Sequence, residues 1–411
     1  MDRAILHCDL NNFYASVECT KNPEYKDIPL AVTGNPKKRT GIVLAKNTLA
    51  KKCGVKTGDV IWKAKQLCPN IVCVSPDFES YAKYSEKVKQ IYLKYTDFVE
   101  PFGIDECWLD ITHSQKLFGS PYKIAEKIKN EIKQTLGLTI SIGISFSKMF
   151  AKLGSKLAGN DEINAITKAD YKEKTWHLPV ENLIYVGRKR LVQFKKMNIN
   201  TIGDLAKTDK DLMIAQYGVN GEYLVKIANG CEPDNVSNYN NLRTIKSIGN
   251  GTTSIVDISS FEQAKQLIFY LSETIAKRLR EKGFKCLCIN LAIKDTSLKF
   301  IAHSKTFESP TNNALEIAMF CIDLFKKNWD FSKQKEPIRA IRIATSNLIS
   351  DKESFQTNLF DDLTTKEKAL KTDTTIDKIK NKYGENKIKR ALLLNAKHIN
   401  CEISDDFFEE L

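Results

Sequence analysis

The order of apolar segments in residues 3–145 is the feature that most constrains how this chain can fold. A strand-like run ends at Asp9, and after residues 11–75 a helical pattern of large apolar residues begins at Phe78. A strand-like stretch at 102–111, broken by Gly103 so that it counts as two strands, a helical pattern from Ile124 and a strand-like run at 139–145 follow. This β-α-β-β-α-β order predicts an antiparallel sheet with helices on one face.

Three carboxylates fall at the strand ends of this predicted sheet. Asp9 ends the first strand, and Asp105 and Glu106 are neighbours in the stretch at 102–111. Neighbours in a regular strand point to opposite faces, but Gly103 permits an irregularity that would bring both acids to one site. Clustered carboxylates without Cys or His partners suit Mg²⁺, and two such ions can carry phosphoryl or nucleotidyl transfer. Three unrelated surface acids are the alternative.

The residues around these acids resemble the motifs of Y-family, lesion-bypass DNA polymerases. The similar stretches are Cys8–Glu18, Gly103–Asp110, Ser141–Ser145 and Lys148–Lys152, and the similarity runs in order from about residue 3 to about residue 395. It is nearest to the bacterial DNA polymerase IV type, with some features closer to the polymerase V catalytic subunit. The resemblance implies low-fidelity, template-directed DNA synthesis from dNTPs.

The resemblance also implies an α+β fold of the right-hand polymerase type. Its parts would be a ferredoxin-like palm (1–10 and 76–167), small fingers (11–75), a helix-hairpin-helix thumb (168–235), a linker (236–243), an α/β little finger (244–347) and a tail (348–411). The little finger has its own β-α-β-β-α-β order, without a sequence repeat of the palm. In the tail, residues after about 348 lack a core-forming pattern until 376–394, which could form one amphipathic helix.

The resemblance assigns roles to the residues of the motifs. Asp9, Asp105 and Glu106 would be catalytic and hold two Mg²⁺ ions, with the carbonyl of Leu10 completing one metal shell. The expected dNTP contacts are Phe13, Tyr14, Asn47, Lys51 and Lys152. Tyr14 would be the steric gate that excludes a ribose 2′-OH, and its alternative is a core aromatic.

Two asparagines follow Asp9 and Leu10, and they bear on where the first helix begins and on which residues bind metal. Asn11 and Asn12 offer N-cap side chains for a helix that begins near Phe13. Asn11 stands where polymerase IV-type enzymes often have Asp. An amide lacks that charge, so Asn11 is left out of the predicted metal shell.

The chain departs from the family pattern where the triphosphate is expected. Thr48 and Lys51 stand where relatives often have Tyr and Arg, and Lys lacks the bidentate fork of Arg. Gly159 stands where many relatives have Lys, and Lys156 is a candidate substitute. Ile42 and Gly58 fall where relatives place the small roof over the nascent base pair, and a roof with few bulky side chains implies low fidelity.

DNA and clamp contacts are predicted in the second half of the chain. In the thumb, Gly187 would let backbone N–H groups approach a phosphate, with Arg188 and Lys189 adding charge; an ordinary helical hairpin is the alternative. The candidate DNA contacts of the little finger are Lys246, Arg339 and Arg342. The alternative is that these residues only form solvated strand surface. Gln356, Leu359 and Phe360 resemble the peptide by which bacterial polymerases bind the β sliding clamp.

Composition agrees with a nucleic-acid partner. The chain has 63 Lys and Arg against 50 Asp and Glu, a net charge of +13, and a sequence pI near 9.0. Its 11 cysteines have no CxxC pair, which favours reduced packing residues. No apolar run is long enough to span a bilayer, and the N-terminal residues lead directly into the first strand. We therefore expect a cytoplasmic protein without a signal peptide, and separately we expect it to be a monomer.

Two other functions fit parts of the sequence. A nucleotidyl cyclase uses a similar palm with acidic residues, but it would need neither the thumb nor the second sheet. A catalytically inactive DNA- or clamp-binding accessory protein would have lost its carboxylates, and all three are present. Primer extension with Mg²⁺ and dNTPs separates both alternatives from a polymerase.

Overall fold

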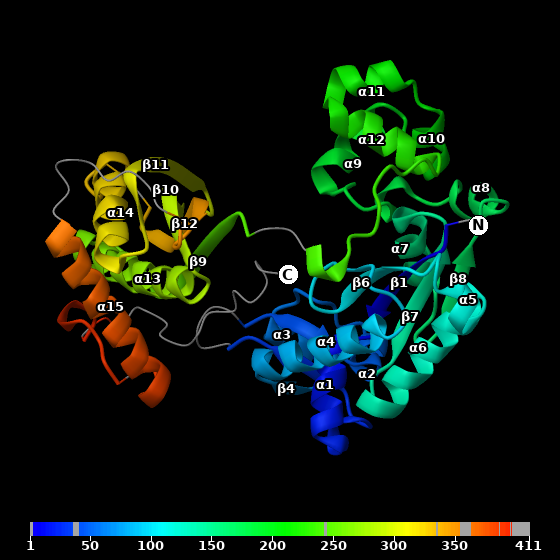
Figure 1. The fold of residues 1–411 in the computed structure, drawn as a ribbon, viewed down its shortest axis with the longest axis horizontal. Helices are drawn as coiled ribbons and strands as arrows, with labels where there is room; N and C mark the ends of the chain where they lie inside the picture. The colour runs from blue at the N-terminus through cyan, green and yellow to red at the C-terminus, as the bar shows by residue number, and fades with distance from the viewer. Residues whose placement is uncertain are drawn as a thin grey trace. The chain divides into compact units, whose positions relative to one another are not determined.

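The computed structural model describes residues 3–35, 41–241, 245–333, 336–353, 363–385, 387–394 and 396. They form two compact units, which we describe one at a time (Figure 1). The first unit holds residues 3–34 and 42–241, and the second holds the described residues from 245 onward.

A five-stranded sheet of order β5-β6-β1-β7-β8 forms the centre of the first unit. β1 is antiparallel to both β6 and β7, β5 pairs antiparallel with β6, and β8 adds a parallel edge beside β7. The predicted β-α-β-β-α-β order is therefore present, with one parallel strand that the prediction lacked. The elements are β1 Ile5–Leu10, α4 Phe78–Leu93, β5 Val99–Pro101, β6 Glu106–Asp110, α5 Gln115–Phe118, α6 Pro121–Leu136, β7 Ile140–Ser145, α7 Lys148–Leu157 and β8 Ile163–Ile166.

Helices α4 and α6 of the predicted order lie on one face of this sheet, as predicted, and α7, which follows that order, covers the other face. One face packs against α4 and α6, and Leu6 and Cys8 of β1 belong to that core. Helix α7 covers the other face, where Ile5 packs with Trp108 and Ala151. The α7 backbone approaches β7 so closely that a Cβ on Gly143 would lie 1.9 Å from the Ala151 carbonyl oxygen. Only glycine permits that approach.

Residues 11–75 form a small subdomain beside this sheet. Its three strands have the order β3-β2-β4, in which β2 is antiparallel to β3 and parallel to β4. A core of short side chains, including Ala50, Val55 and Ala64, fills the space below α2 and α3. The elements are α1 Phe13–Lys21, η1 Pro23–Tyr25, β2 Leu30–Thr33, β3 Val43–Lys46, α2 Thr48–Lys52, α3 Ile61–Leu67 and β4 Val72–Val74.

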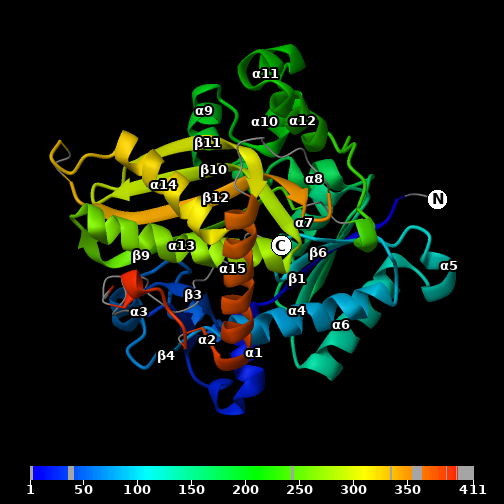
Figure 2. The same ribbon diagram turned by 60° about the vertical axis from the view of Figure 1, so that its left-hand side comes forward.

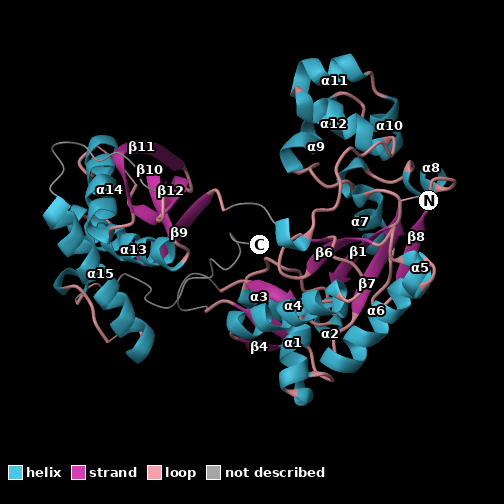
Figure 3. Ribbon diagram, viewed as in Figure 1, coloured by secondary structure: helices cyan, strands magenta, loops and turns pink. Residues whose placement is uncertain are grey.

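Residues 171–241 are helical, and Figure 3 shows them as short helices joined by loops. They share a core with Met149, Phe150 and Leu153 of α7. The chain then returns to the central sheet, where Val236 is buried and Ser237 N donates to Glu100 Oε2 at 2.8 Å. The elements are α8 Tyr171–Thr175, η3 Val180–Asn182, α9 Arg188–Lys196, α10 Ile202–Lys207, α11 Lys210–Tyr217, α12 Val219–Ala228 and η4 Tyr239–Asn241.

The second unit contains the second β-α-β-β-α-β order that the sequence predicts. Its four strands are all antiparallel in the order β11-β10-β12-β9 (Figure 2), and α13 and α14 pack against them around one core. The elements are β9 Ser247–Ile258, α13 Phe261–Glu281, β10 Phe284–Asp295, β11 Phe300–Thr311, α14 Ala314–Asn328, β12 Ile338–Ser350, α15 Leu363–Tyr383 and η5 Ala391–Leu393.

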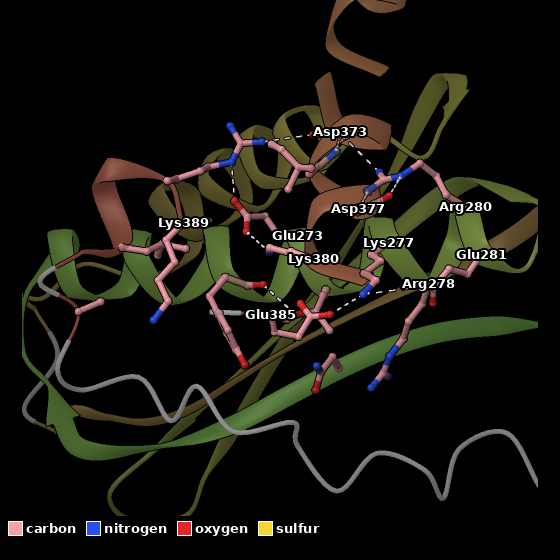
Figure 4. Close-up of a pocket in the computed structure, with 18 residues that line it drawn as sticks. Glu273, Lys277, Arg278, Arg280, Glu281, Asp373, Asp377, Lys380, Glu385 and Lys389 are labelled. Carbon is pink, nitrogen blue, oxygen red and sulfur yellow. Dashed lines mark hydrogen bonds and ion pairs between the residues drawn. The ribbon is translucent and has the colours of Figure 1, made fainter. Parts of the chain in front are cut away.

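Helix α15 differs from its prediction, because it begins at Leu363 rather than near residue 376 and ends at Tyr383. It is joined to α13 and α14 mainly by charged groups (Figure 4). The carboxylate of Asp373 is 4% exposed, accepts hydrogen bonds from Ala314 N and Asn313 Nδ2, and lies 3.4 Å from both Arg280 and Arg390. An apolar periodicity therefore could not reveal this helix.

Candidate active site

The register of β1 against β6 places two of the three predicted acids side by side. Asp9 is the direct partner of Glu106 in this antiparallel pair. Because strand side chains alternate, Asp9 and Glu106 share a face with His7 and Trp108, the face that α7 covers.

A turn brings the third acid to the same place. β5 ends at Pro101 and β6 begins at Glu106, and between them Gly103 has φ 91°. Leu10 N donates a hydrogen bond of 3.1 Å to the Asp105 carbonyl oxygen, which ties this turn to the end of β1. The irregularity predicted at Gly103 is confirmed, since Asp105 lies in the turn and Glu106 starts the strand.

The three acids are electrostatically unequal. Burial, followed by the charges of Glu106 and Asp105, raises the pKa of Asp9 to about 7. Burial and the charge of Glu106 raise the pKa of Asp105 to about 6. Burial also acts to raise the pKa of Glu106, but the contact with His7 and the charge of Lys152 outweigh it and lower that pKa. Two of the carboxylates therefore lack a compensating cation.

Two residues behind the acids hold Glu106. Lys152 of α7 forms an ion pair with Glu106 Oε2, and its ammonium group lies 4.7 Å from the centre of the Phe102 ring. His7 is fully buried, with Nε2 3.4 Å from Glu106 Oε2 and Nδ1 2.6 Å from Ser155 Oγ. Sequence reasoning missed His7, although its position two residues before Asp9 places it on the same strand face.

The donor set fits a divalent cation of the magnesium type. In the described ranges no three His, Cys, Asp or Glu side chains form a ready-made metal site, and Glu106 is held by Lys152 and His7. The three acids nevertheless supply only oxygen ligands, which Mg²⁺ prefers. The raised pKa values of Asp9 and Asp105 indicate uncompensated negative charge, which a bound dication would stabilise.

Asn11 uses its amide for structure, in agreement with leaving it out of the metal shell. Its Nδ2 donates to Ser141 Oγ at 2.7 Å, and its Oδ1 accepts from Asp161 N at 2.9 Å. Asn12 is the N-cap residue of α1 and the helix begins at Phe13 as predicted, but no side-chain cap forms. Asn12 has φ 51°, a conformation that Asn tolerates, and its Nδ2 lies 3.5 Å from Thr48 Oγ1 instead.

The predicted gate residue lies in an aromatic cluster. Tyr14 is 8% exposed, stacks on Tyr81 with ring centres 4.3 Å apart, and meets Phe78 edge-on at 6.0 Å. Phe13 is buried beside both tyrosines. Tyr81 Oη donates to Glu18 Oε1 at 2.7 Å, so the surface behind the Tyr14 ring is rigid.

Asn47 and Lys51, the predicted triphosphate contacts in residues 11–75, differ in burial and in their surroundings. Asn47 caps α2 by accepting from Ala50 N, also accepts from Leu30 N, and donates to the Ile28 carbonyl oxygen. These bonds fix the orientation of the Asn47 amide. Lys51 is exposed in the last turn of α2.

The predicted substitute for the missing lysine does not lie free. Lys156 Nζ donates to Asn182 Oδ1 at 2.8 Å. A Cβ on Gly159 would lie 2.5 Å from the Glu162 carboxylate, which accepts from Gly159 N. Instead, Asn160 Nδ2 lies 3.3 Å from Thr48 Oγ1 and bridges α2 to this loop. Sequence reasoning did not identify Asn160.

The predicted DNA contacts of residues 168–235 gather around one groove. Gly187 is the N-cap residue of α9, and a Cβ there would meet nothing within 4 Å. Tyr185 is 56% exposed and has φ 68°. The groove is lined by Tyr185, Gly187, Arg188, Lys189, Arg190, Gln193 and Tyr217.

In the second unit the structure gathers only part of the predicted DNA-binding set. Arg342 lies in a groove with Thr252, Thr253, Lys294 and Phe300. Lys246 is exposed and Arg339 is half-buried, but neither lines this groove. The predicted clamp residues Gln356, Leu359 and Phe360 lie outside the described residues. Among the described helices, none is long and apolar enough to cross a membrane.

Two family models match the chain. Residues 8–156 match the impB/mucB/samB family, and residues 245–359 match the C-terminal domain of the impB/mucB/samB family. The first match contains all three acids and the second covers most of the C-terminal sheet unit.

Similar proteins agree with these matches. A DNA polymerase IV of Acetivibrio thermocellus is 41% identical over 97% of this chain and 100% of its own length. A DNA polymerase IV of Clostridium acetobutylicum is 35% identical over 96% of this chain and 99% of its own. The fold is similar to that of a Y-family DNA polymerase chimera, with a TM-score of 0.75 at 22% identity over 84% of this chain and 99% of that chain.

Proposed function

This chain belongs to the impB/mucB/samB family of Y-family DNA polymerases, and from that premise we propose that Asp9, Asp105 and Glu106 carry its nucleotidyl transfer. The chain is a DNA-directed DNA polymerase of the lesion-bypass class, and its substrates are primer–template DNA and dNTPs. Neither the inactive accessory nor the cyclase is supported, because the full-length relatives are named as polymerases. Y-family polymerases depend on divalent metal ions; two Mg²⁺ ions in this site are our proposal.

One observation carries the assignment of the centre. Asp9 and Glu106 are paired in register, and the turn at Gly103 adds Asp105, so three carboxylates converge with two of them uncompensated. Asp9, Asp105, Glu106 and the Leu10 carbonyl would hold the metal ions. Bound there, such ions would supply Lewis-acid chemistry that lowers the pKa of the primer 3′-OH and neutralises the charge of the triphosphate and pyrophosphate.

The chain's own residues would orient the nucleotide. Tyr14 would lie below the sugar, with Phe13 and Tyr81 fixing its ring by packing. Lys51 and Lys152 would bind the triphosphate as point charges. Ile42 is 40% exposed and paired with Val60, and it would form part of the roof over the base pair.

Exchange of the acids tests the catalytic assignment. Asp105→Ala and Glu106→Ala should each lower single-nucleotide incorporation by at least about 100-fold, because the charge that stabilises the reacting phosphate is lost. Binding of primer–template DNA should stay within a few fold, since it rests on many backbone contacts. Exposed Asp27→Ala is the matched control and should leave both unchanged. Near-normal incorporation by either acid variant would refute the site.

Exchange of Tyr14 tests the gate. Tyr14→Ala should admit ribonucleotides and retain dNTP incorporation, because the ring acts by volume. Tyr14→Phe is the control and should keep the selectivity for dNTPs, since it preserves the stacked ring. If Tyr14→Ala is folded and its rNTP:dNTP ratio equals that of the unmodified enzyme, the gate lies elsewhere.

We also propose that Gln356, Leu359 and Phe360 bind the β sliding clamp, on the basis of their sequence pattern. Leu359→Ala with Phe360→Ala should abolish clamp-dependent processivity and leave distributive synthesis intact, because tethering raises the effective concentration at the primer end. A titration that gives unchanged clamp affinity for the double variant would contradict the assignment. A chromosomal substrate supports a cytoplasmic location, and we propose that the enzyme acts as a monomer apart from the clamp.

A further inference from the structure

Helix α15 of the second unit docks through the acidic residues of one face (Figure 4). Arg280 of α13 pairs with Asp377 at 2.7 Å and with the buried Asp373 at 3.4 Å. Lys380 joins the same interface through its ion pair with Glu273 of α13 at 3.3 Å. Two of the acids that could neutralise the lysines of α15 are therefore used for docking.

The remaining lysines described on α15 lie on the opposite face and form what we call the lysine stripe. The stripe consists of Lys368, Lys371, Lys378 and Lys382, all of them exposed, with the exposed Thr375 between them. At 3.6 residues per turn, these positions fall within about 80° of one another around the helix axis. A rise of 1.5 Å per residue makes the stripe about 21 Å long.

The charge of the lysine stripe is not neutralised within the described part of the chain. None of its four ammonium groups forms an ion pair there, and that of Lys382 lies 5.1 Å from the centre of the Tyr383 ring. The exposed face of α4 is different, because Glu79 and Glu86 alternate with its lysines and Lys83 pairs with Glu79. A face with a single sign of charge attracts a partner of the opposite sign.

The chemistry of the stripe selects the kind of partner. It contains no apolar side chain, whereas protein interfaces generally depend on buried apolar or aromatic anchors. A helix that lies on a membrane needs an apolar face opposite its lysines, and the opposite face of α15 is docked through carboxylates. A regular polyanion is the partner that remains.

We propose that the lysine stripe binds the phosphate backbone of duplex DNA. Duplex DNA carries one negative charge per about 1.7 Å of its axis, so a stripe of about 21 Å faces a segment with on the order of 12 phosphates. Lysine ammonium groups contact phosphates as point charges and read no base sequence. Helix α15 begins at Leu363, beyond residues 245–359 that match the family's C-terminal domain, so this surface is an addition to that domain. The proposal rests on DNA as the substrate and not on the proposed metal site.

The salt dependence of DNA binding tests the proposal. The full-length protein and a variant with all four lysines of the stripe changed to Gln are titrated with a labelled primer–template duplex at increasing KCl, and binding is followed by fluorescence anisotropy. Each phosphate contact adds about 0.9 to the slope of log K against log salt, so the variant's slope should be shallower by about 3 and its affinity at low salt at least about tenfold lower.

A matched control separates the stripe from net charge. It changes four exposed lysines of α4, α5 and α6 to Gln, which alters the net charge equally: Lys87, Lys116, Lys123 and Lys127. This control should keep the slope of the unmodified protein. An unchanged slope in the stripe variant, or an equal loss in both variants, would overturn the proposal.

Lysine acetylation of the unmodified protein gives a direct readout that does not depend on a variant. The protein is treated with an N-hydroxysuccinimide ester of acetate, with and without duplex DNA, and each lysine is quantified by mass spectrometry. The four lysines of the stripe should react several-fold more slowly with DNA bound, while the four control lysines should not change. Full reactivity of the stripe in the DNA complex, or protection by the sliding clamp instead of by DNA, would refute a DNA-binding stripe. Neither result would affect the catalytic assignment, which incorporation by the acid variants tests.

Discussion

Replacing Asp9 by Asn should stabilise the metal-free protein while abolishing its activity. The pKa of Asp9 is raised from 3.8 to about 7, because burial and the charges of Glu106 and Asp105 disfavour ionisation. A carboxyl group of this kind keeps its proton in the folded state when the unfolded chain has already released it. Folded-state stability therefore falls as pH rises from 3.8 to about 7 and stays low above that range.

The size of the effect follows from the shift. At about 1.4 kcal/mol per pKa unit, the ionised Asp9 lowers the free energy of unfolding by up to about 4 kcal/mol at pH 8. Asn has nearly the same shape and no charge, so Asp9→Asn removes this penalty. The gain should be close to zero at pH 4, grow up to about pH 7, and correspond to an increase in Tm on the order of 10 °C at pH 8.

Thermal unfolding in EDTA, followed by tryptophan fluorescence, measures this gain. Trp108 is 2% exposed and packs edge-on against His7 at 5.3 Å, so its emission reports on the strand that carries Asp9. Adding Mg²⁺ at pH 8 should raise the Tm of the unmodified protein and not that of Asp9→Asn. Asp27→Asn, an exposed position, is the control. A gain that is absent at pH 8, or equal at pH 4 and pH 8, would refute the electrostatic reasoning.

Two further substitutions test the packing. Gly143→Ala should lower the free energy of unfolding by about 3 kcal/mol in chemical denaturation, because its Cβ would meet the Ala151 carbonyl oxygen at 1.9 Å; Gly187→Ala, where the space is open, should not. Asp373→Ala should destabilise the second unit by about 1–3 kcal/mol, seen in the denaturation of Trp329, because it leaves Asn313 Nδ2 and Ala314 N without their buried acceptor. Equal stability of either variant and the parent would contradict the corresponding contact.

The sequence predicted the parts of the fold that depend on strand periodicity. Both β-α-β-β-α-β orders are present, because alternating apolar residues identify half-buried strands regardless of what lies next to them. The pairing of Asp9 with Glu106 could not be predicted from this alternation. Register depends on which strands meet, and that is decided by contacts between segments about 100 residues apart.

Sequence patterns did not predict the elements that are held in place by polar contacts. Helix α15 begins 13 residues before its apolar pattern does, because Asp373, Asp377 and Lys380 join it to α13 through ion pairs. Asn12 was expected to cap α1, but it has a left-handed backbone conformation and no side-chain cap forms, and its Nδ2 lies near Thr48 instead. Charged and amide side chains have no period that reveals their partner, so such contacts emerge only from the tertiary structure.

Lys152 is paired with Glu106 in the site and is also a residue proposed to bind the triphosphate. It was predicted from sequence to bind the triphosphate, and in the structure its ammonium group is paired with Glu106. That ion pair neutralises one of three clustered carboxylates and lowers the pKa of Glu106, while Asp9 and Asp105 remain uncompensated. One ammonium group cannot bind Glu106 and a triphosphate at full strength. If Lys152 binds the nucleotide as proposed, nucleotide arrival therefore releases Glu106 at the moment when the site needs a third anionic ligand. The same lysine then stabilises the empty site and couples its opening to substrate binding.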